Sequence, residues 1–412
     1  MYDDPRPDPR LLSAAAQNLL VDCAGLRAGD EVVICYETAD YGWYDAGAAM
    51  AVAAEAEALG LRVRRCEALP PDRDQPPEVT QLLASTANIV FFARIGDQGR
   101  FDGAGQGRRV MVYARNAADL ASEFGRVPHR AMVGLKTAVD AVLFSARAID
   151  ITCPNGTRIS GRAPGAGGDG AIPADVTTRR FPLGVPAPVP AKLFSGRVAL
   201  TGALTPTGNR CYDPAVLPLQ GVVFGLVEHG RITGFEGNAA DVSRIRAHYE
   251  TVANGFGIDP YVVHSWHAGI HPGCPFFGAA ERGLDYWSNT VFSNPRLLHF
   301  HTCGTVAPGE ISWNVVDATV LVDGVPLRLL VRGRPLPPRV ACGIGSRIAL
   351  ALHTAFDRLP RRKRKPYRLV HGDLSPVDVL VGPAGDLRID GVGNRVGPRP
   401  ADGDPLRKHL PR

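Results

Sequence analysis

The sequence predicts an α/β protein with two lobes, in which an N-terminal βαβ lobe on a parallel sheet precedes a β-rich α+β lobe. Three observations support this fold class. The chain has 412 residues, more than one hydrophobic core usually holds. Its first third alternates strand-like and helix-like segments, and short strands interrupted by Gly and Pro follow from Asp150 onward. We expect domains at 1–148, 149–338 and 339–412, the last being an extension or the completion of the second.

The first lobe is predicted from hydrophobic periodicity, which repeats about every 3.6 residues in a helix and every two in a strand. Its helices are expected at Leu11–Cys23, Ala46–Leu61, Glu78–Ser85, Ala117–Phe124 and Met132–Ile149. Its strands are expected at Glu31–Tyr36, Val63–Cys66, Asn88–Phe92 and Arg109–Tyr113. Strands that alternate with helices form a parallel sheet. No GxGxxG motif follows the first strand, so the sequence does not support a dinucleotide site.

The second lobe is predicted from shorter apolar segments that turn residues separate. Its one helix is expected at Ala239–Asn254, and its strands at Gly196–Leu200, Gly221–Glu228, Ile232–Glu236, Leu297–Thr302, Val315–Val322 and Leu327–Val331. Glycine-rich 161–174 and proline-rich 181–191 are expected to be loops. Further along we expect a helix at Ile344–Leu359 and a strand pair at Val379–Val381 and Leu387–Ile389.

Composition excludes several classes of protein. No apolar run approaches the roughly 20 residues that span a bilayer, and the first ten residues lack the basic start and apolar middle of a signal peptide. We therefore expect a cytoplasmic protein without a membrane partner. The net charge is +5, but six basic residues gather at 361–368, so we expect no nucleic-acid partner. Eight widely spaced cysteines without a CxxC pair predict reduced thiols.

Histidine is concentrated in one short region of the second lobe. Five of the 11 histidines lie there: His264, His267, His271, His299 and His301. The last two stand two apart in a predicted strand and therefore share a face. Imidazole is a common ligand of zinc, iron and copper, and two strands that each offer a histidine can meet at one ion. The alternative is that these are hydrogen-bonded core or surface histidines.

A three-ligand site also needs an oxygen ligand. The candidates are Asp317, Glu310 and Asp373, the last within the unit His371-Gly372-Asp373. Two histidines and one carboxylate on one face of iron(II) leave positions free for substrate and O₂, whereas His and acidic ligands around zinc or paired metals activate water. The ligand set alone does not choose between these metals.

Several segments follow one another in an order shared with a known family. They are 19–33, 151–157, 181–186 and 230–237, and the most specific of the matches is Trp266–Gly273. Over about residues 11–335 the chain resembles the aminopeptidase T family of metallopeptidases and its relative, the 2,5-dihydroxypyridine 5,6-dioxygenases. In this resemblance His267 takes the place of one family metal ligand, and His301 matches a second.

The resemblance also shows departures from the family pattern. A histidine at 267, where the peptidases have Glu, is similar to the mononuclear-iron dioxygenases. The first Glu ligand of the peptidases falls at Val185, which cannot bind a metal. The closing His-x-Asp of the family falls either at Ser312–Asn314, where the ligands are lost, or at His371 and Asp373, where they are kept. On chemical grounds we favour the second alignment.

The resemblance implies a metal-dependent enzyme with its catalytic site in the second lobe. The implied activity is that of a mononuclear non-haem iron dioxygenase, with a small aromatic or heteroaromatic metabolite such as a hydroxylated pyridine as substrate. The implied ion is Fe(II), or alternatively Zn, Co or Mn, and its ligands would be His267, His301, His371 and Asp373. Members of the family associate, so we expect a homodimer or a higher homo-oligomer.

Two further histidines are candidate catalytic groups. His264 and His271 would act as acid/base groups near the substrate or as alternative ligands. Trp266, Tyr286 and Trp287 would line the pocket.

Two other functions remain open. One is a metal-dependent aminopeptidase or amide hydrolase, in which zinc or cobalt activates water and His271 acts as base. The other is a non-catalytic relative in which the residues at 185, 312 and 314 have removed the metal site.

Overall fold

The computed structural model confirms the α/β fold class, with a five-stranded parallel sheet and several helices. It describes two short strands late in the chain and residues 7–98, 107–163, 176–206, 212–275, 291–304 and 309–331. The chain divides into two compact units, Met1–Arg334 and Pro335–Arg412. In the second unit the described residues form one antiparallel pair, β19 (Val379–Val381) with β20 (Leu387–Ile389), as predicted. The helix expected at Ile344–Leu359 lies outside the described residues.

The first sheet has the strand order β2-β1-β3-β4-β7 and is parallel throughout. Its strands are β1 (Glu31–Tyr36), β2 (Arg62–Glu67), β3 (Ile89–Phe92), β4 (Arg109–Val112) and β7 (Arg179–Phe181). The apolar run Val32–Cys35 of β1 is fully buried, as expected where helices cover a parallel sheet. The fifth strand, β7, comes from a later part of the chain, after the strands β5 (Ile149–Thr152) and β6 (Arg158–Gly161) have formed part of another sheet.

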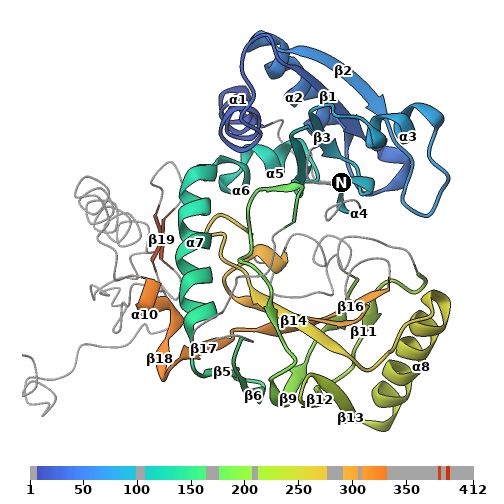
Figure 1. Ribbon diagram of the computed structural model, residues 1–412, viewed down its shortest axis with the longest axis vertical. Coiled ribbons are helices and arrows are strands. Elements are labelled where there is room, and N and C mark those ends of the chain that lie inside the picture. Colours follow the sequence, from blue (N-terminus) through green and yellow to red (C-terminus); the bar gives the residue numbers. More distant parts are fainter. Residues whose placement is uncertain are drawn as a thin grey trace, which may run out of the picture. The chain divides into compact units, whose positions relative to one another are not determined.

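Several helices of the first lobe begin at a residue whose side chain caps them. Asp45 accepts a hydrogen bond from the Ala48 N–H (3.2 Å) at the start of α2 (Ala46–Ala58). Figure 1 shows α2 beside β1, which it contacts, and α1 beside α2. The other helical elements are α1 (Pro9–Gln17), η1 (Asn18–Cys23), η2 (Ala39–Tyr41), α3 (Pro77–Ala84), α4 (Ile95–Gln98), α5 (Ala117–Ala121), α6 (Glu123–Arg126) and α7 (His129–Ser145).

The β-rich part consists mainly of two antiparallel sheets. The larger has the order β13-β12-β9-β6-β5-β17-β18, and the smaller has the order β16-β15-β14-β8. The further strands of the larger sheet are β9 (Ser195–Leu200), β12 (Val223–Glu228), β13 (Arg231–Glu236), β17 (Thr319–Val322) and β18 (Val325–Pro326). Those of the smaller sheet are β8 (Val189–Pro190), β14 (Val263–Ala268), β15 (Leu297–Cys303) and β16 (Glu310–Val316). A short pair, β10 (Ala203–Leu204) with β11 (Leu217–Pro218), forms a sheet of its own, and β10 contacts β16.

One hydrophobic core joins these two sheets to the helix α8 (Ala239–Phe256), which Asn238 caps at its start. Trp313 of β16 is fully buried in this core, and its Nε1 donates to the hydroxyl of Tyr249 in α8 (2.6 Å). Gly225 of β12 faces the same ring, and a Cβ atom at this position would lie 2.5 Å from it. Only glycine leaves room for the indole ring against the backbone of β12 at this position.

Four sequence predictions need correction. Leu327–Val331 is a short helix, α10, and not a strand, because a short apolar run fits both patterns. Val315–Val322 is two strands, β16 and β17, which Asp317 separates with a φ of 55°. The helix expected to reach Ile149 ends at Ser145, since Ala146 is extended and Ile149 begins β5. The loop expected at 181–191 contains the end of β7 and all of β8.

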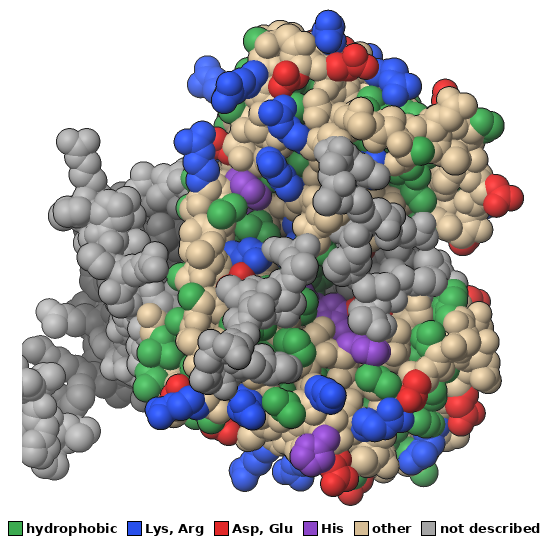
Figure 2. Space-filling view, viewed as in Figure 1, with side chains coloured by type: hydrophobic (Ala, Val, Ile, Leu, Met, Phe, Trp, Pro, Cys, Tyr) green, Lys and Arg blue, Asp and Glu red, His purple; other side chains and the backbone are tan. Residues whose placement is uncertain are grey.

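Among the helices that the structure describes, none has the length and apolar character needed to span a bilayer. Charged side chains of both signs are interspersed on the face drawn in Figure 2.

Candidate metal centre

Three neighbouring strands, β14, β15 and β16, build a polar face. They pair antiparallel, so residues directly opposite one another point to the same side of the sheet. One side carries Trp266, Phe300 and Trp313, which are fully buried in the core. The other side carries a polar row that consists of His267, His299, His301, Glu310, Ser312 and Asn314.

This polar row is almost as inaccessible to water as the core. The exposed fractions are 5% for His267, 2% for His299, 7% for His301 and 1% for Glu310. The largest patch of histidine surface on the face drawn in Figure 2 lies near its middle. Buried polar groups destabilise a protein unless they are hydrogen-bonded or bind a ligand. These side chains therefore need one another or a bound group.

His267 is held in one orientation by the backbone. Its Nδ1 lies 3.0 Å from the carbonyl oxygen of Pro186. A carbonyl oxygen only accepts, so Nδ1 carries the hydrogen and donates it. In the neutral ring the Nε2 atom is then an acceptor, which is the form that binds a metal.

His301 is held in the same way by a carboxylate. Its Nδ1 contacts the Glu310 carboxylate, which also accepts, so Nδ1 again carries the hydrogen. The Nε2 atoms of His301 and His267 lie 2.8 Å apart. With the hydrogen of each neutral ring on Nδ1, the two facing Nε2 lone pairs repel each other. A positive charge at this point, either a proton or a metal ion, removes the repulsion.

His299 completes the cluster from the middle strand. It stands directly opposite His267 in the register of β14 and β15, with 4.4 Å between the ring centres. Burial, with a smaller contribution from the Arg180 cation, lowers the pKa of His299 to about 3, so its ring is neutral. Within the residues that the structure describes, its buried Nδ1 atom has no hydrogen-bond partner. A neutral ring with an unsatisfied buried nitrogen is suited to metal binding.

These observations fit a metal ion. One nitrogen from each of His267, His299 and His301 lies within 4.8 Å of the others. Three imidazole ligands suit zinc, iron and copper. A carboxylate behind a ligating histidine, as Glu310 stands behind His301, is the usual support of such a ligand. The metal site expected from the sequence therefore has a geometric basis. The three histidines alone do not determine which ion is bound.

The structure separates His264 and His271 from this cluster. His264 is half-buried, and its Nε2 lies 2.7 Å from the backbone oxygen of Cys303. His271 is fully buried in the loop after β14, where its Nδ1 accepts from the Gly273 N–H (3.2 Å) and its ring lies edge-on to Phe124. Burial lowers the pKa of His271 to about 3. Neither residue belongs to the three histidines whose nitrogens converge.

The other predicted site residues lie elsewhere. Asp317 forms an ion pair with Arg296 at the surface (2.7 Å). Trp266 points into the core, on the side of the sheet opposite His267. The ligands expected at His371 and Asp373 lie outside the described residues and within the second unit of the chain, and Tyr286 and Trp287 are outside them as well.

Two positions at which this chain departs from the family pattern lie beside the histidine cluster. Ser312 stands opposite His301, and Asn314 stands opposite His299. Asn314 donates from Nδ2 to the hydroxyl of Thr205 (3.0 Å). One of the two alignments places the closing His-x-Asp of the family at Ser312–Asn314. These positions lie beside the histidines, and this chain has neutral side chains there.

His299 was not predicted as a ligand from the sequence, and Glu310 was only one of three candidate oxygen ligands. Part of the evidence for His299 was present in the sequence, because His299 and His301 stand two apart in a predicted strand and therefore share a face. The missing information was the register that sets β15 between β14 and β16. That register brings His267 and Glu310 to opposite edges of the same histidine pair.

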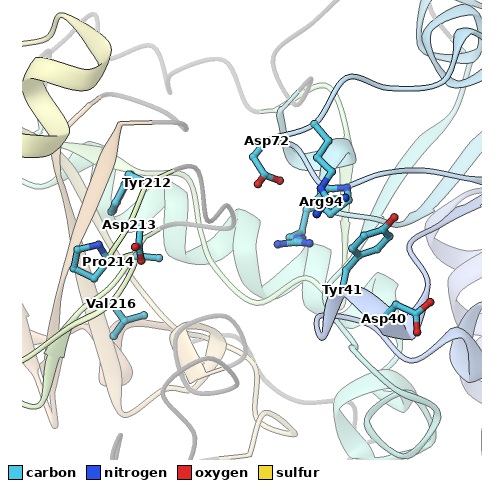
Figure 3. A pocket seen from close by; sticks show the side chains of 11 residues that line it. Asp40, Tyr41, Asp72, Arg94, Tyr212, Asp213, Pro214 and Val216 are labelled. Atoms are coloured by element: carbon cyan, nitrogen blue, oxygen red, sulfur yellow. The ribbon is translucent and has the colours of Figure 1, made fainter.

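An open cavity of about 690 Å³ lies apart from the cluster, and none of the three histidines lines it. Figure 3 shows Tyr41, Asp72 and Arg94 on one side and Tyr212 and Asp213 on the other. Tyr212 links it to the polar row, because its hydroxyl donates to the backbone oxygen of Glu310 (2.6 Å). The nitrogens that converge are therefore not part of the lining of this cavity.

No protein-family model matches the chain, and no curated protein matches its sequence. Among solved structures it is similar to 2,5-dihydroxypyridine dioxygenase from Pseudomonas putida KT2440, with 13% identity, a TM-score of 0.50, and coverage of 77% of this chain and 95% of that one. The two proteins share a fold. The chain also matches wild-type AmpT from Thermus thermophilus at 12% identity, with a TM-score of 0.40 over 77% of this chain and 97% of that one. The relationship to this fold family is distant.

Proposed function

We propose that this chain is a metal-dependent enzyme whose ion is held by His267, His299 and His301. The observation that carries the proposal is the pair of Nε2 atoms of His267 and His301, 2.8 Å apart, with both Nδ1 atoms already engaged by oxygens. This ligand set keeps two of the residues expected from the sequence. It replaces His371 and Asp373 by His299, with Glu310 as the supporting carboxylate.

Within that class we propose a mononuclear non-haem iron oxygenase that acts on a small aromatic or heteroaromatic compound. Two observations support it: the fold shared with a 2,5-dihydroxypyridine dioxygenase, and a set of imidazole nitrogens of the kind that binds iron. Iron(II) in this position would supply the redox chemistry by which O₂ reacts with an electron-rich ring.

The side chains around the cluster have defined tasks in this proposal. Glu310 accepts the Nδ1–H of His301, which fixes the ring and makes Nε2 a stronger donor to a metal. The Pro186 carbonyl does the same for His267. Phe292 lies edge-on to His299 (5.6 Å between ring centres) and gives the cluster an aromatic flank against which a flat ring can pack. Tyr113 lies edge-on to Phe292 in turn.

A hydrolase remains a second candidate because of one specific observation. Three histidine nitrogens are also the ligand set of a zinc ion that activates water, and no oxidation is needed for that chemistry. In this case the substrate would be a small amide or peptide, as expected from the aminopeptidase alternative.

Metal analysis of anaerobically purified protein tests the proposed site. We expect about one ion per chain in the wild type, and loss of that ion in His267→Ala, His299→Ala and His301→Ala. His371→Ala should keep it, because His371 is not a ligand in this proposal. The exposed His229 in the β12–β13 turn, replaced by Asn to suit its φ of 47°, is the matched control.

Activity then separates the candidate functions. Oxygen uptake with hydroxylated pyridines or related phenols, in iron-loaded protein only, supports the oxygenase. Metal-stimulated cleavage of amide substrates without O₂ supports the hydrolase. Metal loss in His371→Ala would contradict the ligand set, and a wild type that binds no ion after reconstitution would mean that the two Nε2 atoms share a proton instead.

A further inference from the structure

Two cysteines of the first sheet lie directly opposite each other. Cys35 of β1 pairs with Cys66 of β2 in the parallel register, so both side chains point to the same face. Adjacent strands lie about 4.8 Å apart, and a disulfide bridges Cα atoms that are about 4.4–6.8 Å apart. Both are free thiols, and they are hydrogen-bonded to each other. The spacing of the two strands at this pair is therefore within the range that a disulfide bridges.

The two thiols differ in character. The hydrogen bond from Cys35, helped by the nearby Arg64 cation, lowers the pKa of Cys66 to about 7, while the same bond and burial raise the pKa of Cys35. Cys66 is thus partly thiolate at neutral pH, the form that acts as a nucleophile. Cys35 remains protonated and donates. This division of roles suits a reactive cysteine beside a resolving one.

The position of Cys66 also favours access. β2 is an edge strand of its sheet, and the neighbours of Cys66 along the strand, Arg65 and Glu67, are exposed. Cys66 itself is 4% exposed and Cys35 is fully buried. Opening of an edge strand requires less free energy than opening of a central one. An oxidant therefore reaches Cys66 first. The other described cysteines, Cys23, Cys153, Cys274 and Cys303, occupy separate elements.

We propose that Cys35 and Cys66 form a reversible dithiol–disulfide pair that small hydroperoxides oxidise. The Cys66 thiolate attacks the terminal peroxide oxygen, the O–O bond breaks, and the alkoxide leaves and takes a proton from water to become an alcohol. The resulting sulfenic acid is attacked by the sulfur of Cys35, which forms the S–S bond and releases one water. Two electrons pass from the two sulfurs to the peroxide, and a soluble dithiol restores both thiols by exchange. The pair is independent of the histidine cluster.

Mass spectrometry of the full chain tests the proposal. After treatment with one equivalent of cumene hydroperoxide we expect a loss of about 2 Da that dithiothreitol reverses, and a cross-linked peptide that contains Cys35 and Cys66. Cys66→Ala and Cys35→Ala should each abolish this peptide, and Cys153→Ala should retain it. In Cys35→Ala, dimedone should label Cys66 because no resolving thiol remains. A cross-link between other cysteines, or no mass loss, would overturn the proposal.

The pH dependence of alkylation gives a second readout that does not require oxidation. In the wild type the rate of Cys66 alkylation should rise with a midpoint near pH 7. Cys35→Ala removes the hydrogen-bond donor and should move that midpoint upward, whereas Cys35→Ser keeps a donor and should keep it low. Circular dichroism confirms that each variant is folded. Equal midpoints in Cys35→Ala and Cys35→Ser would contradict the role given to Cys35.

Discussion

The Nε2 atoms of His267 and His301 lie 2.8 Å apart, and neither ring can turn away without losing the oxygen that holds its Nδ1 atom. Pro186 and Glu310 thus force two acceptors together in a buried place. In the absence of a cation this arrangement destabilises the fold. We therefore expect a bound divalent metal to raise the stability of the protein.

The first prediction concerns this gain. At a free metal concentration of about one hundred times Kd, Fe(II) or Zn(II) should raise the free energy of unfolding by about 2.7 kcal/mol. Thermal unfolding with and without metal measures it. His267→Ala should show no metal-dependent shift, and His229→Asn should behave as the wild type does. An equal shift in His267→Ala would place the bound metal elsewhere.

Glu310→Gln tests the carboxylate that supports His301. The amide keeps the size of the side chain and removes its charge, so His301 becomes a weaker ligand. Metal affinity should fall roughly 10- to 100-fold, as measured by competition with a chelator, while the folded structure is retained. Glu228→Gln, at an exposed glutamate on β12, is the matched control. An unchanged metal affinity in Glu310→Gln would show that Glu310 does not support the ligand His301.

Gly225→Ala tests the close approach of β12 to Trp313. The added Cβ atom would lie 2.5 Å from the indole ring, so the ring or the strand must shift. We expect a loss of about 1–3 kcal/mol in the free energy of unfolding, measured by urea denaturation. Gly234→Ala on the neighbouring strand is the control, because its Cβ would meet Leu226 at an ordinary 3.7 Å. Equal losses in both variants would refute the steric argument.

His248 of α8 should make stability depend on pH. Burial lowers the pKa of its imidazole from 6.5 to about 4, so the unfolded chain binds a proton more readily than the folded one between these values. The contribution of the neutral ring to stability is present above pH 6.5 and is lost as the pH falls towards 4. Its full size is on the order of 3 kcal/mol, since one pKa unit corresponds to about 1.4 kcal/mol.

Urea denaturation of metal-free protein measures this effect. His248→Gln should lose less stability than the wild type between pH 7 and pH 4.5, because the amide does not titrate. Above pH 7 the difference between the two proteins should be constant, which serves as the internal control. Parallel curves over the whole range would show that His248 is not responsible.

Glu37→Gln tests a buried ion pair in the first lobe. Arg94 donates from Nε and Nη2 to the Glu37 carboxylate, and the two side chains are 6% and 0% exposed. Removal of the negative charge leaves the guanidinium buried without its counter-ion, so we expect a loss of about 3–5 kcal/mol. Glu57→Gln breaks the exposed pair with Arg65 and should change stability by less than about 1 kcal/mol. Similar losses in the two variants would contradict this account.

Much of the fold follows from local patterns. β1 extends over Glu31–Tyr36, as expected, because a short apolar run between turn residues favours a buried strand. The helix α8 agrees closely for the same kind of reason, since Asn238 and Gly257 mark its two ends. By contrast, Leu327–Val331 is helical where a strand was expected, since five residues carry too little periodicity to decide.

The candidate site was harder to predict because it depends on contacts between strands. His267 and His301 could be proposed from the resemblance, and the face shared by His299 and His301 from alternation. The partners of these residues depend on the register of β14, β15 and β16, which pairs His299 with His267 and with Asn314. Local sequence does not encode that register, since the neighbours lie far along the chain.

The strand β7 has a consequence for how the protein is made. During synthesis β1 to β4 leave the ribosome first, and the edge of β4 has no partner until Arg179–Phe181 has followed, after β5 and β6. A nascent chain that ends at residue 148 therefore exposes the polar backbone groups of a largely apolar strand. The first sheet is thus complete only when residue 181 of 412 has emerged, well after β4, and a chaperone would protect the open edge until then.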